Sequence, residues 1–241
     1  MFVLSSAWHR GWGAPRSALL TVFLTGAVVA GCSRSMPEPP PPSRPPAVSP
    51  RQTILRVMEL RRERKYTELR ELVVPESGPE VMTTLMAVDE FLDANRRLCT
   101  WVRDNVGIGL SQTIDQSYIG DMLGIFARYV ELLDESITGG QADISFTVDG
   151  RLPARRALLR KVDGVWRYDP ESGYPEQLPA AFREMARGLD QVLSELENGR
   201  ITVAELRDDA SRLMERVQHN LRRGVRLLSE ARAAAENRSR K

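Results

Sequence analysis

A proline-rich segment near the N-terminus constrains this chain most strongly: residues 33–50 read SRSMPEPPPPSRPPAVSP. Proline has a fixed φ and no backbone N–H, so such a run supports neither a helix nor the ladder of a sheet. We predict an extended, semi-rigid tether, which spans roughly 50 Å at about 3.1 Å per residue. The compact fold must therefore be built from the residues that follow. The alternative interpretation is a polyproline ligand for a partner domain.

The segment before the tether has the three zones of an export signal. Arg10 and Arg16 precede the apolar run ALLTVFLTGAVVAG, no acidic residue occurs, and small residues lead up to Cys32. The apolar run has about 14 residues, whereas a helix needs roughly 20 to cross the hydrocarbon core of a bilayer. Residues 1–31 are therefore predicted to be a cleaved signal peptide and not a transmembrane helix.

The end of this segment, Val29-Ala30-Gly31-Cys32, resembles the lipobox of bacterial lipoproteins. The resemblance implies cleavage between Gly31 and Cys32, attachment of diacylglycerol to the Cys32 thiol, and acylation of the new amino terminus, for example by palmitate. Stable anchoring needs at least two acyl chains, because each buried methylene contributes only about 0.8 kcal/mol. The implied location is the cell envelope, and Ser33 favours the outer membrane, facing the periplasm, in a Gram-negative organism. A buried or unpaired cysteine is the alternative.

Removal of the signal changes the composition. The 34 basic residues lose Arg10 and Arg16, which leaves 32 against 32 acidic residues. A neutral mature chain lacks the basic excess of a nucleic-acid-binding protein, so we expect no nucleic-acid partner. With Cys32 lipidated, His219 and Cys99 are the remaining histidine and cysteine. We therefore predict no disulfide, metal site, cofactor or histidine-based catalytic site, with His219 as a surface residue.

Helical spacing of apolar residues dominates the first half of the mature chain. It predicts helices over residues 51–74, 80–104 and 112–135. The charged run at residues 61–65 is interpreted as a solvated face of the first helix, and Cys99 as a small core residue of the second. The alternatives are an anionic-lipid contact for the run and a reactive thiol for Cys99.

Residues 142–169 change to strand periodicity. Asp149-Gly150 and Asp163-Gly164 favour type I′ turns and divide the segment into a three-stranded antiparallel meander. Three strands need a cover, which the preceding helices supply. This pattern, with its VDGVWRY sequence, resembles the end of NTF2-like or SnoaL-like domains. The resemblance implies a small-ligand-binding or weakly catalytic pocket near Trp166 and Tyr168.

Residues 177–235 return to helical spacing and predict an antiparallel hairpin. Asn198-Gly199 ends the first helix, and a capping box of Thr202 and Glu205 opens a second, long one. The apolar seam of the hairpin either packs within the chain or mediates self-association or binding of a partner helix. Residues 236–241 form a basic tail that we expect to be frayed.

These inferences define a helix-rich α+β fold in which N-terminal helices cover a small antiparallel meander, NTF2-like by resemblance, followed by the helical hairpin. The predicted segments are the signal peptide 1–31, the lipidated cysteine and tether 32–50, the α+β domain 51–176, the hairpin 177–235 and the tail 236–241. The predicted function is a non-enzymatic binding or structural role for a lipid-anchored protein with an envelope protein partner. A small-ligand-binding or weakly catalytic domain is the alternative, and self-association would use the C-terminal helices.

Overall fold

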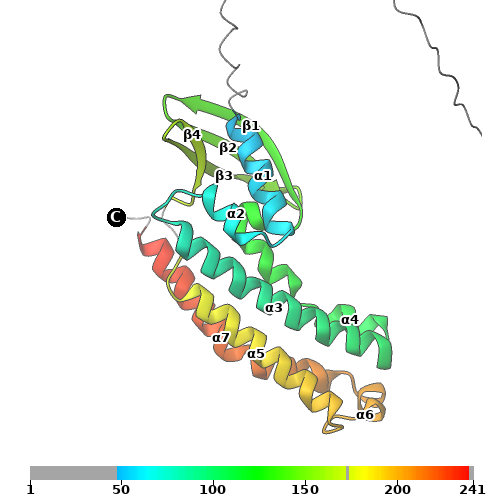
Figure 1. Cartoon of the computed structure of the whole chain (residues 1–241). Helices are drawn as coiled ribbons and strands as arrows, with labels where there is room; N and C mark the ends of the chain where they lie inside the picture. Colours follow the sequence, from blue (N-terminus) through cyan, green and yellow to red (C-terminus); the bar gives the residue numbers. More distant parts are fainter. Residues whose placement is uncertain (1–47, 172–173, 239–241) are drawn as a thin grey trace, which may run out of the picture. The chain divides into compact units, whose positions relative to one another are not determined.

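The computed structural model describes residues 48–171 and 174–238, so the signal peptide, Cys32 and most of the tether lie outside the described residues. The predicted helix-rich α+β class is confirmed: a four-stranded antiparallel sheet follows one group of helices along the chain and precedes another, and it lies at one end of the long helices (Figure 1). The helices are α1 (Pro50–Arg62), α2 (Tyr66–Glu71), α3 (Gly78–Asn105), α4 (Ile108–Ile114), the 3-10 helix η1 (Ser117–Phe126), α5 (Leu178–Glu197), α6 (Val203–Asp208) and α7 (Ser211–Arg238). The strands are β1 (Val130–Thr138), β2 (Gln141–Val148), β3 (Arg151–Val162) and β4 (Val165–Asp169). Within these two ranges, none of the helices combines the length and apolar composition needed to cross a bilayer.

The chain enters the fold at α1, which begins at Pro50, so the predicted end of the tether at residue 50 is wrong and the helix starts within the predicted segment. Ser49 caps this helix: its hydroxyl accepts from the Gln52 N–H, the Gln52 side chain accepts from the Ser49 N–H, and Pro50 fills the first turn. The predicted single helix over residues 51–74 is wrong, because the chain turns at Arg64, where φ is +57°. Helices α1 and α2 are therefore separate. At this turn the side chains of Arg61 and Arg64 contact α3.

The sheet has the order β1-β2-β3-β4. Both predicted Asp-Gly turns are confirmed, since Asp149, Gly150, Asp163 and Gly164 all have positive φ, as a type I′ turn requires. One face of the sheet packs on α1 and η1 and carries the buried side chains Ala142, Ile144, Phe146, Val148, Ala157, Leu159, Trp166 and Tyr168. The N-terminal cover that the sequence predicts is thus supplied mainly by α1.

The predicted helix over residues 112–135 is wrong. This segment forms the end of α4, then η1, then strand β1, so the meander has four strands and not three. A long-range contact holds the irregular strand β1: the Arg51 guanidinium donates to the carbonyl oxygens of Leu132 and Leu133 at 2.9 and 2.8 Å, where the register with β2 shifts. The Glu135 carboxylate accepts from the Arg51 N–H, in the first turn of α1. Tertiary pairing overrides local helical spacing here.

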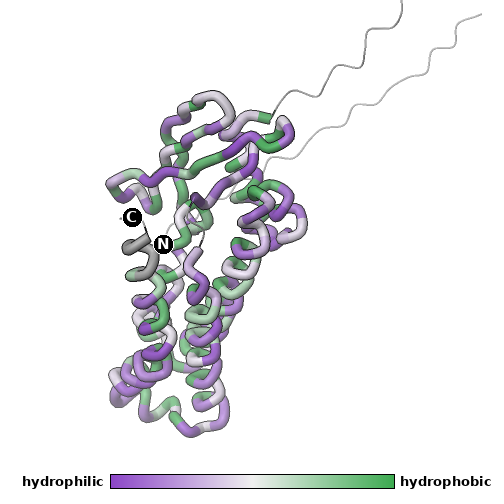
Figure 2. Tube along the Cα trace, turned by 90° about the vertical axis from the view of Figure 1, so that its left-hand side faces the viewer, coloured by the Kyte–Doolittle hydropathy of each residue, from purple (hydrophilic) through white to green (hydrophobic). Residues whose placement is uncertain are grey.

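Helices α3, α5 and α7 lie side by side, with α5 in the middle (Figure 1). Figure 2 shows hydrophobic and hydrophilic residues alternating along them, as expected for amphipathic helices. Phe91 of α3 meets Phe182 of α5 with ring centroids 5.7 Å apart. On the other side of α5, Arg216 of α7 makes two hydrogen bonds of 2.6 Å to the Glu195 carboxylate. The seam residues of the hairpin therefore pack within the chain.

The long second helix predicted for the hairpin is interrupted. The capping box of Thr202 and Glu205 is present, but it opens the short helix α6, which ends at Asp208. Asp209 then accepts hydrogen bonds from the N–H and the hydroxyl of Ser211, where α7 begins. Its side chain competes locally with helix continuation. At the other end, α7 continues to Arg238, into the segment predicted to be frayed.

Candidate functional site

The two residues of the predicted ligand pocket lie in the core. Trp166 and Tyr168 of β4 are 9% and 8% exposed. The Tyr168 ring meets Phe126 edge-on, with centroids 5.6 Å apart, and burial raises the pKa of its hydroxyl to about 12. Its backbone pairs with the segment after α2, donating to Leu72 and accepting from Val74. Neither side chain lines one of the open cavities described below.

Cys99 and His219 occupy the kinds of place that the sequence predicts. Cys99 is half-buried on α3, and burial, followed by the charge of Asp115, raises the pKa of its thiol to about 11. His219 is exposed on α7, beside a shallow hollow with Arg216 and Arg222. Within the part of the chain that the structure describes, no three histidine, cysteine or acidic side chains gather as metal ligands would.

The charged run at residues 61–65 was predicted to be a solvated helix face, and this prediction is wrong for two of its residues. Arg61 is only 8% exposed, and its guanidinium makes a bidentate pair with Asp89 of α3 at 2.7 and 2.5 Å. Arg64 makes a second bidentate pair, with Asp93, at 2.7 Å for both bonds. Two of the five residues therefore fasten the α1–α2 turn to α3.

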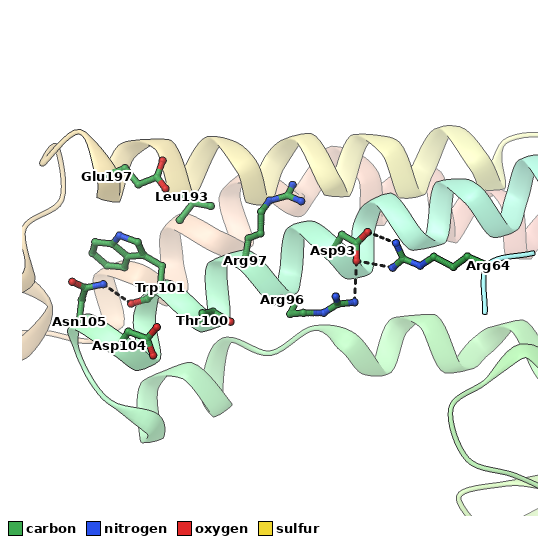
Figure 3. Close-up of a pocket in the computed structure, with 10 residues that line it drawn as sticks. All are labelled: Arg64, Asp93, Arg96, Arg97, Thr100, Trp101, Asp104, Asn105, Leu193 and Glu197. Carbon is green, nitrogen blue, oxygen red and sulfur yellow. Dashed lines mark hydrogen bonds and ion pairs between the residues drawn. The ribbon is translucent and has the colours of Figure 1, made fainter. Parts of the chain in front are cut away.

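A groove of about 590 Å³ runs along α3 and α5 (Figure 3). Its walls come from the α1–α2 turn, α3 and α5, and its lining residues are Arg64, Asp93, Arg96, Arg97, Thr100, Trp101, Asp104, Asn105, Leu193 and Glu197. Figure 3 shows Arg64 and Arg96 converging on Asp93, while Trp101 lies toward the other end. This is an open groove in which charged side chains and the stems of long residues line the wall beside one large aromatic side chain.

Most of the charged side chains that line this groove form ion pairs with other residues of the fold. Asp93 accepts from Arg64 and pairs with Arg96 at 2.9 Å, and Arg97 pairs with Asp190 of α5 at 2.6 Å. The hydrogen bond from Arg64 lowers the pKa of Asp93, which keeps the carboxylate ionised. A charged ligand would have to displace these pairs, so the groove is the weaker candidate for a binding site.

A second hollow, which we call the sheet-end pocket, lies where η1 meets the β2–β3 hairpin and has a volume of about 540 Å³. Tyr118, Asp121 and Met122 of η1 form one wall, and residues 148–149 and 151–155 of the hairpin form the other. The wall of η1 is fixed in part by Asp121, whose carboxylate accepts from the Arg128 N–H at 3.2 Å.

The sheet-end pocket is surrounded by exposed apolar side chains. Tyr118 is 63% exposed, Met122 41% and Leu152 81%, while Tyr129, whose carbonyl accepts from the Asp149 N–H, is 68% exposed. Tyrosine, methionine and arginine, three of the residue types at this pocket, are enriched at protein interfaces relative to the rest of the surface. Exposed apolar groups of this kind gathered at one place indicate a binding surface.

Sequence reasoning missed this pocket and the buried Arg61. Local spacing assigned Tyr118, Met122 and Tyr129 to the apolar stripe of a helix that does not form, so their exposure could not be foreseen. One available signal was the RLPARR sequence of residues 151–156, which places a leucine among arginines next to a turn. Arg61 has no such signal, because its partner Asp89 is far away in the sequence.

Comparisons with protein-family models, with curated proteins and with solved structures find no match for this chain.

Proposed function

We propose that this protein is a lipid-anchored component of the cell envelope with a non-enzymatic role: it binds a protein partner through the sheet-end pocket. Cys32 carries the lipid, residues 33–48, which precede the capping residue Ser49, act as the tether, and the fold that begins at α1 presents the binding surface. In a Gram-negative organism the anchor lies in the outer membrane and the fold faces the periplasm.

The observation that carries the binding role is the exposure of Tyr118, Met122 and Leu152 around a pocket of about 540 Å³. Covering such side chains removes apolar area from water, which stabilises a complex by about 25 cal/mol per Å² before the costs of association. The lipobox sequence supports the anchoring role separately, so the two parts of the proposal can be tested independently.

The alternative function, a small-ligand-binding or weakly catalytic NTF2-like pocket, has less support. Its expected residues, Trp166 and Tyr168, are packed against Lys161 and Phe126. Self-association through the C-terminal helices also remains a prediction, although the buried seam of α7 faces α5 within the same chain.

Fractionation of cells tests the anchor. Wild-type protein is expected in the membrane pellet and to resist extraction by high salt, whereas Cys32→Ala protein is expected to lose the lipid. The anchor is refuted if wild-type protein carries no lipid and the variant fractionates in the same way as wild type.

Affinity purification of the lipidated protein from its native membrane tests the binding surface. Leu152→Asp places a charge among the exposed apolar groups of the sheet-end pocket and should abolish capture of the partner. Ile108→Asp is the matched control, because Ile108 is an exposed apolar residue of α4, 64% exposed and away from the pocket. Capture that survives Leu152→Asp, or fails equally in both variants, contradicts the proposed surface.

A further inference from the structure

We infer that the partner contributes an extended, acidic polypeptide segment, which adds a strand at the free edge of β3 and places an apolar side chain in the sheet-end pocket. This inference rests on the proposed function only in taking the sheet-end pocket as the binding surface. It adds the backbone conformation and the charge of the segment that binds there.

The free edge exists because β4 is much shorter than β3. Strand β4 pairs with β3 from Val162 to Leu158, and its last paired residue is Asp169. The chain then turns away through Glu171, where φ is +53°. The first half of β3, Arg151 to Arg156, is exposed and has a strand neighbour, β2, on one side only.

The backbone at this edge is correctly oriented to pair. Lys161 donates its N–H to Gly140, on the β2 side of the strand. Backbone groups of successive strand residues face opposite edges, and the register between residues 155 and 162 is regular. The N–H and C=O of Arg156 therefore face away from β2, at the position just beyond the end of β4. A segment bound here would continue the line of β4.

The pocket adjoins this edge, because Leu152, Pro153, Ala154 and Arg155 belong both to β3 and to the pocket lining. The register of β3 with β2 shifts between Arg155 and Arg151, so regular pairing at the free edge is restricted to the residues from Arg155 onward. A short stretch of paired backbone gives little affinity alone. The apolar wall of Tyr118 and Met122 supplies the side-chain anchor that strand addition normally requires.

Charge identifies the chemistry of the segment. Residues 151–157 carry three arginines and no acidic residue. Two carboxylates, Asp121 and Asp149, also line the pocket, and Asp121 is paired with Arg128 at 3.7 Å. Arg155 has no ion pair among the described residues, and Arg151 reaches Asp149 only at 3.9 Å, whereas Arg156 is paired with Asp143 at 2.5 Å. Carboxylates of a bound segment would pair with Arg155 and Arg151.

The same arginines argue against a second copy of this chain as the occupant. Two β3 edges that paired antiparallel would bring arginine against arginine, and like charges facing each other across a strand pair are destabilising. A proline-rich segment also fits poorly, since it lacks the N–H groups that strand pairing uses.

Selection from a displayed library of random twelve-residue peptides tests the inference, with the full lipidated protein in nanodiscs as the target. Enrichment of sequences that carry both acidic and apolar residues is the expected result. Bound peptide should slow hydrogen exchange of the Arg156 amide. The inference is overturned by no enrichment, by enrichment of basic or proline-rich sequences, or by protection confined to another surface.

Two variants make the test specific. Arg155→Glu reverses an exposed charge and should weaken binding of the selected peptide about tenfold or more, the value expected for loss of one charge-assisted contact. Arg222→Glu is the matched control, an exposed arginine of α7 with no ion pair among the described residues, and should leave binding unchanged. Equal effects of the two substitutions would refute the docking site, with the thermal midpoint of each variant showing that it is folded.

Failure of this inference is distinguishable from failure of the proposed function. A partner that is captured in a Leu152-dependent way, but that does not protect Arg156, retains the surface and refutes strand addition. Peptide binding by wild-type protein that is found to carry no lipid retains the docking site and refutes the anchor. Self-association through the edge would appear as a dimer of the wild-type protein, and it would refute the acidic segment as the occupant.

Discussion

Arg61 and Asp89 form the most buried ion pair of the described residues, with both side chains 10% exposed. The pair joins the end of α1 to the middle of α3, and the Tyr66 hydroxyl lies 3.5 Å from the same guanidinium. A buried pair is often no more stabilising than apolar residues of the same volume, but removal of one partner leaves an uncompensated charge.

We predict that Asp89→Ala lowers the free energy of unfolding by about 3–5 kcal/mol. Replacing both partners, as in Arg61→Met with Asp89→Leu, should restore most of that loss. Arg56→Ala, which removes exposed pairs with Glu59 and Glu68, is the control and should leave the urea midpoint nearly unchanged. Similar midpoints for Asp89→Ala and Arg56→Ala would show that the Arg61–Asp89 pair is not structural.

The half-buried thiol of Cys99 is predicted to react slowly with alkylating reagents. Because its thiol pKa is raised to about 11, first by burial and then by Asp115, little thiolate exists near neutral pH. Iodoacetamide should therefore modify the native protein more than tenfold more slowly than the urea-unfolded protein at pH 8. The native rate should continue to rise up to about pH 10, where a thiol with the ordinary pKa of about 8.5 is already fully ionised. A plateau below about pH 10, measured by intact mass against a Cys99→Ser control, would contradict the raised pKa.

At the scale of elements, the α5–α7 contact depends on two glycines. A Cβ atom on Gly188 would lie 2.5 Å from the Asn220 carbonyl oxygen, and one on Gly224 would collide with the Met185 side chain and lie 2.9 Å from the Ala181 oxygen. Backbone atoms cannot retreat as a flexible side chain can. The two helices therefore approach each other more closely than alanine at either position would allow.

Gly188→Ala is predicted to lower the free energy of unfolding by about 1–3 kcal/mol, the usual cost of an overpacked contact. Gly109→Ala is the matched control, because this glycine of α4 has no atom within 4 Å of the added Cβ. That substitution should raise stability by up to about 1 kcal/mol through helix propensity. Thermal unfolding that ranks the two variants in the opposite order would refute the close approach.

The Glu195–Arg216 pair also links α5 to α7 and predicts a dependence on pH. The hydrogen bond from Arg216 lowers the pKa of Glu195 below its ordinary value of 4.5. A carboxyl group whose pKa is lowered by folding stabilises the folded state fully at pH values above its ordinary pKa. This stabilisation is lost as the pH falls through the lowered pKa of the folded state. The difference in unfolding free energy between wild type and Glu195→Gln should be constant above about pH 5 and should shrink below it. A difference independent of pH would contradict this.

Elements with local signals could be predicted and those made by distant contacts could not. Asp149-Gly150 and Asp163-Gly164 specify their turns through their own backbone preferences, and Ser49 and Thr202 cap helices through neighbouring residues. Strand β1 depends on pairing with β2 and on Arg51, and so its helical spacing misled the prediction.

At the scale of the whole molecule, one hydrophobic core joins the described elements from α1 to α7. Phe182 of α5 packs on Phe91 of α3, so the predicted hairpin is part of the same core as the sheet. Such a unit keeps the sheet-end pocket in a fixed position relative to Ser49, where the tether enters the fold. The proposed tether thus carries a rigid binding surface and not a set of independent segments.

One part of the candidate site could be predicted from the sequence and the other could not. Cys32 is proposed from a local motif, so sequence alone was sufficient to suggest it. The sheet-end pocket is formed by η1 and the β2–β3 hairpin. Tyr118 and Leu152 come together there only because the chain packs these two distant segments side by side, so local sequence could not predict the pocket.

The lipid anchor is the central claim, and the intact mass of the protein purified from its native membrane tests it most directly. The account predicts a chain that begins at Cys32, lacks residues 1–31, and carries the added mass of diacylglycerol and an amino-terminal acyl chain. A chain with the unmodified mass of about 27.1 kDa and a free Cys32 thiol would contradict it.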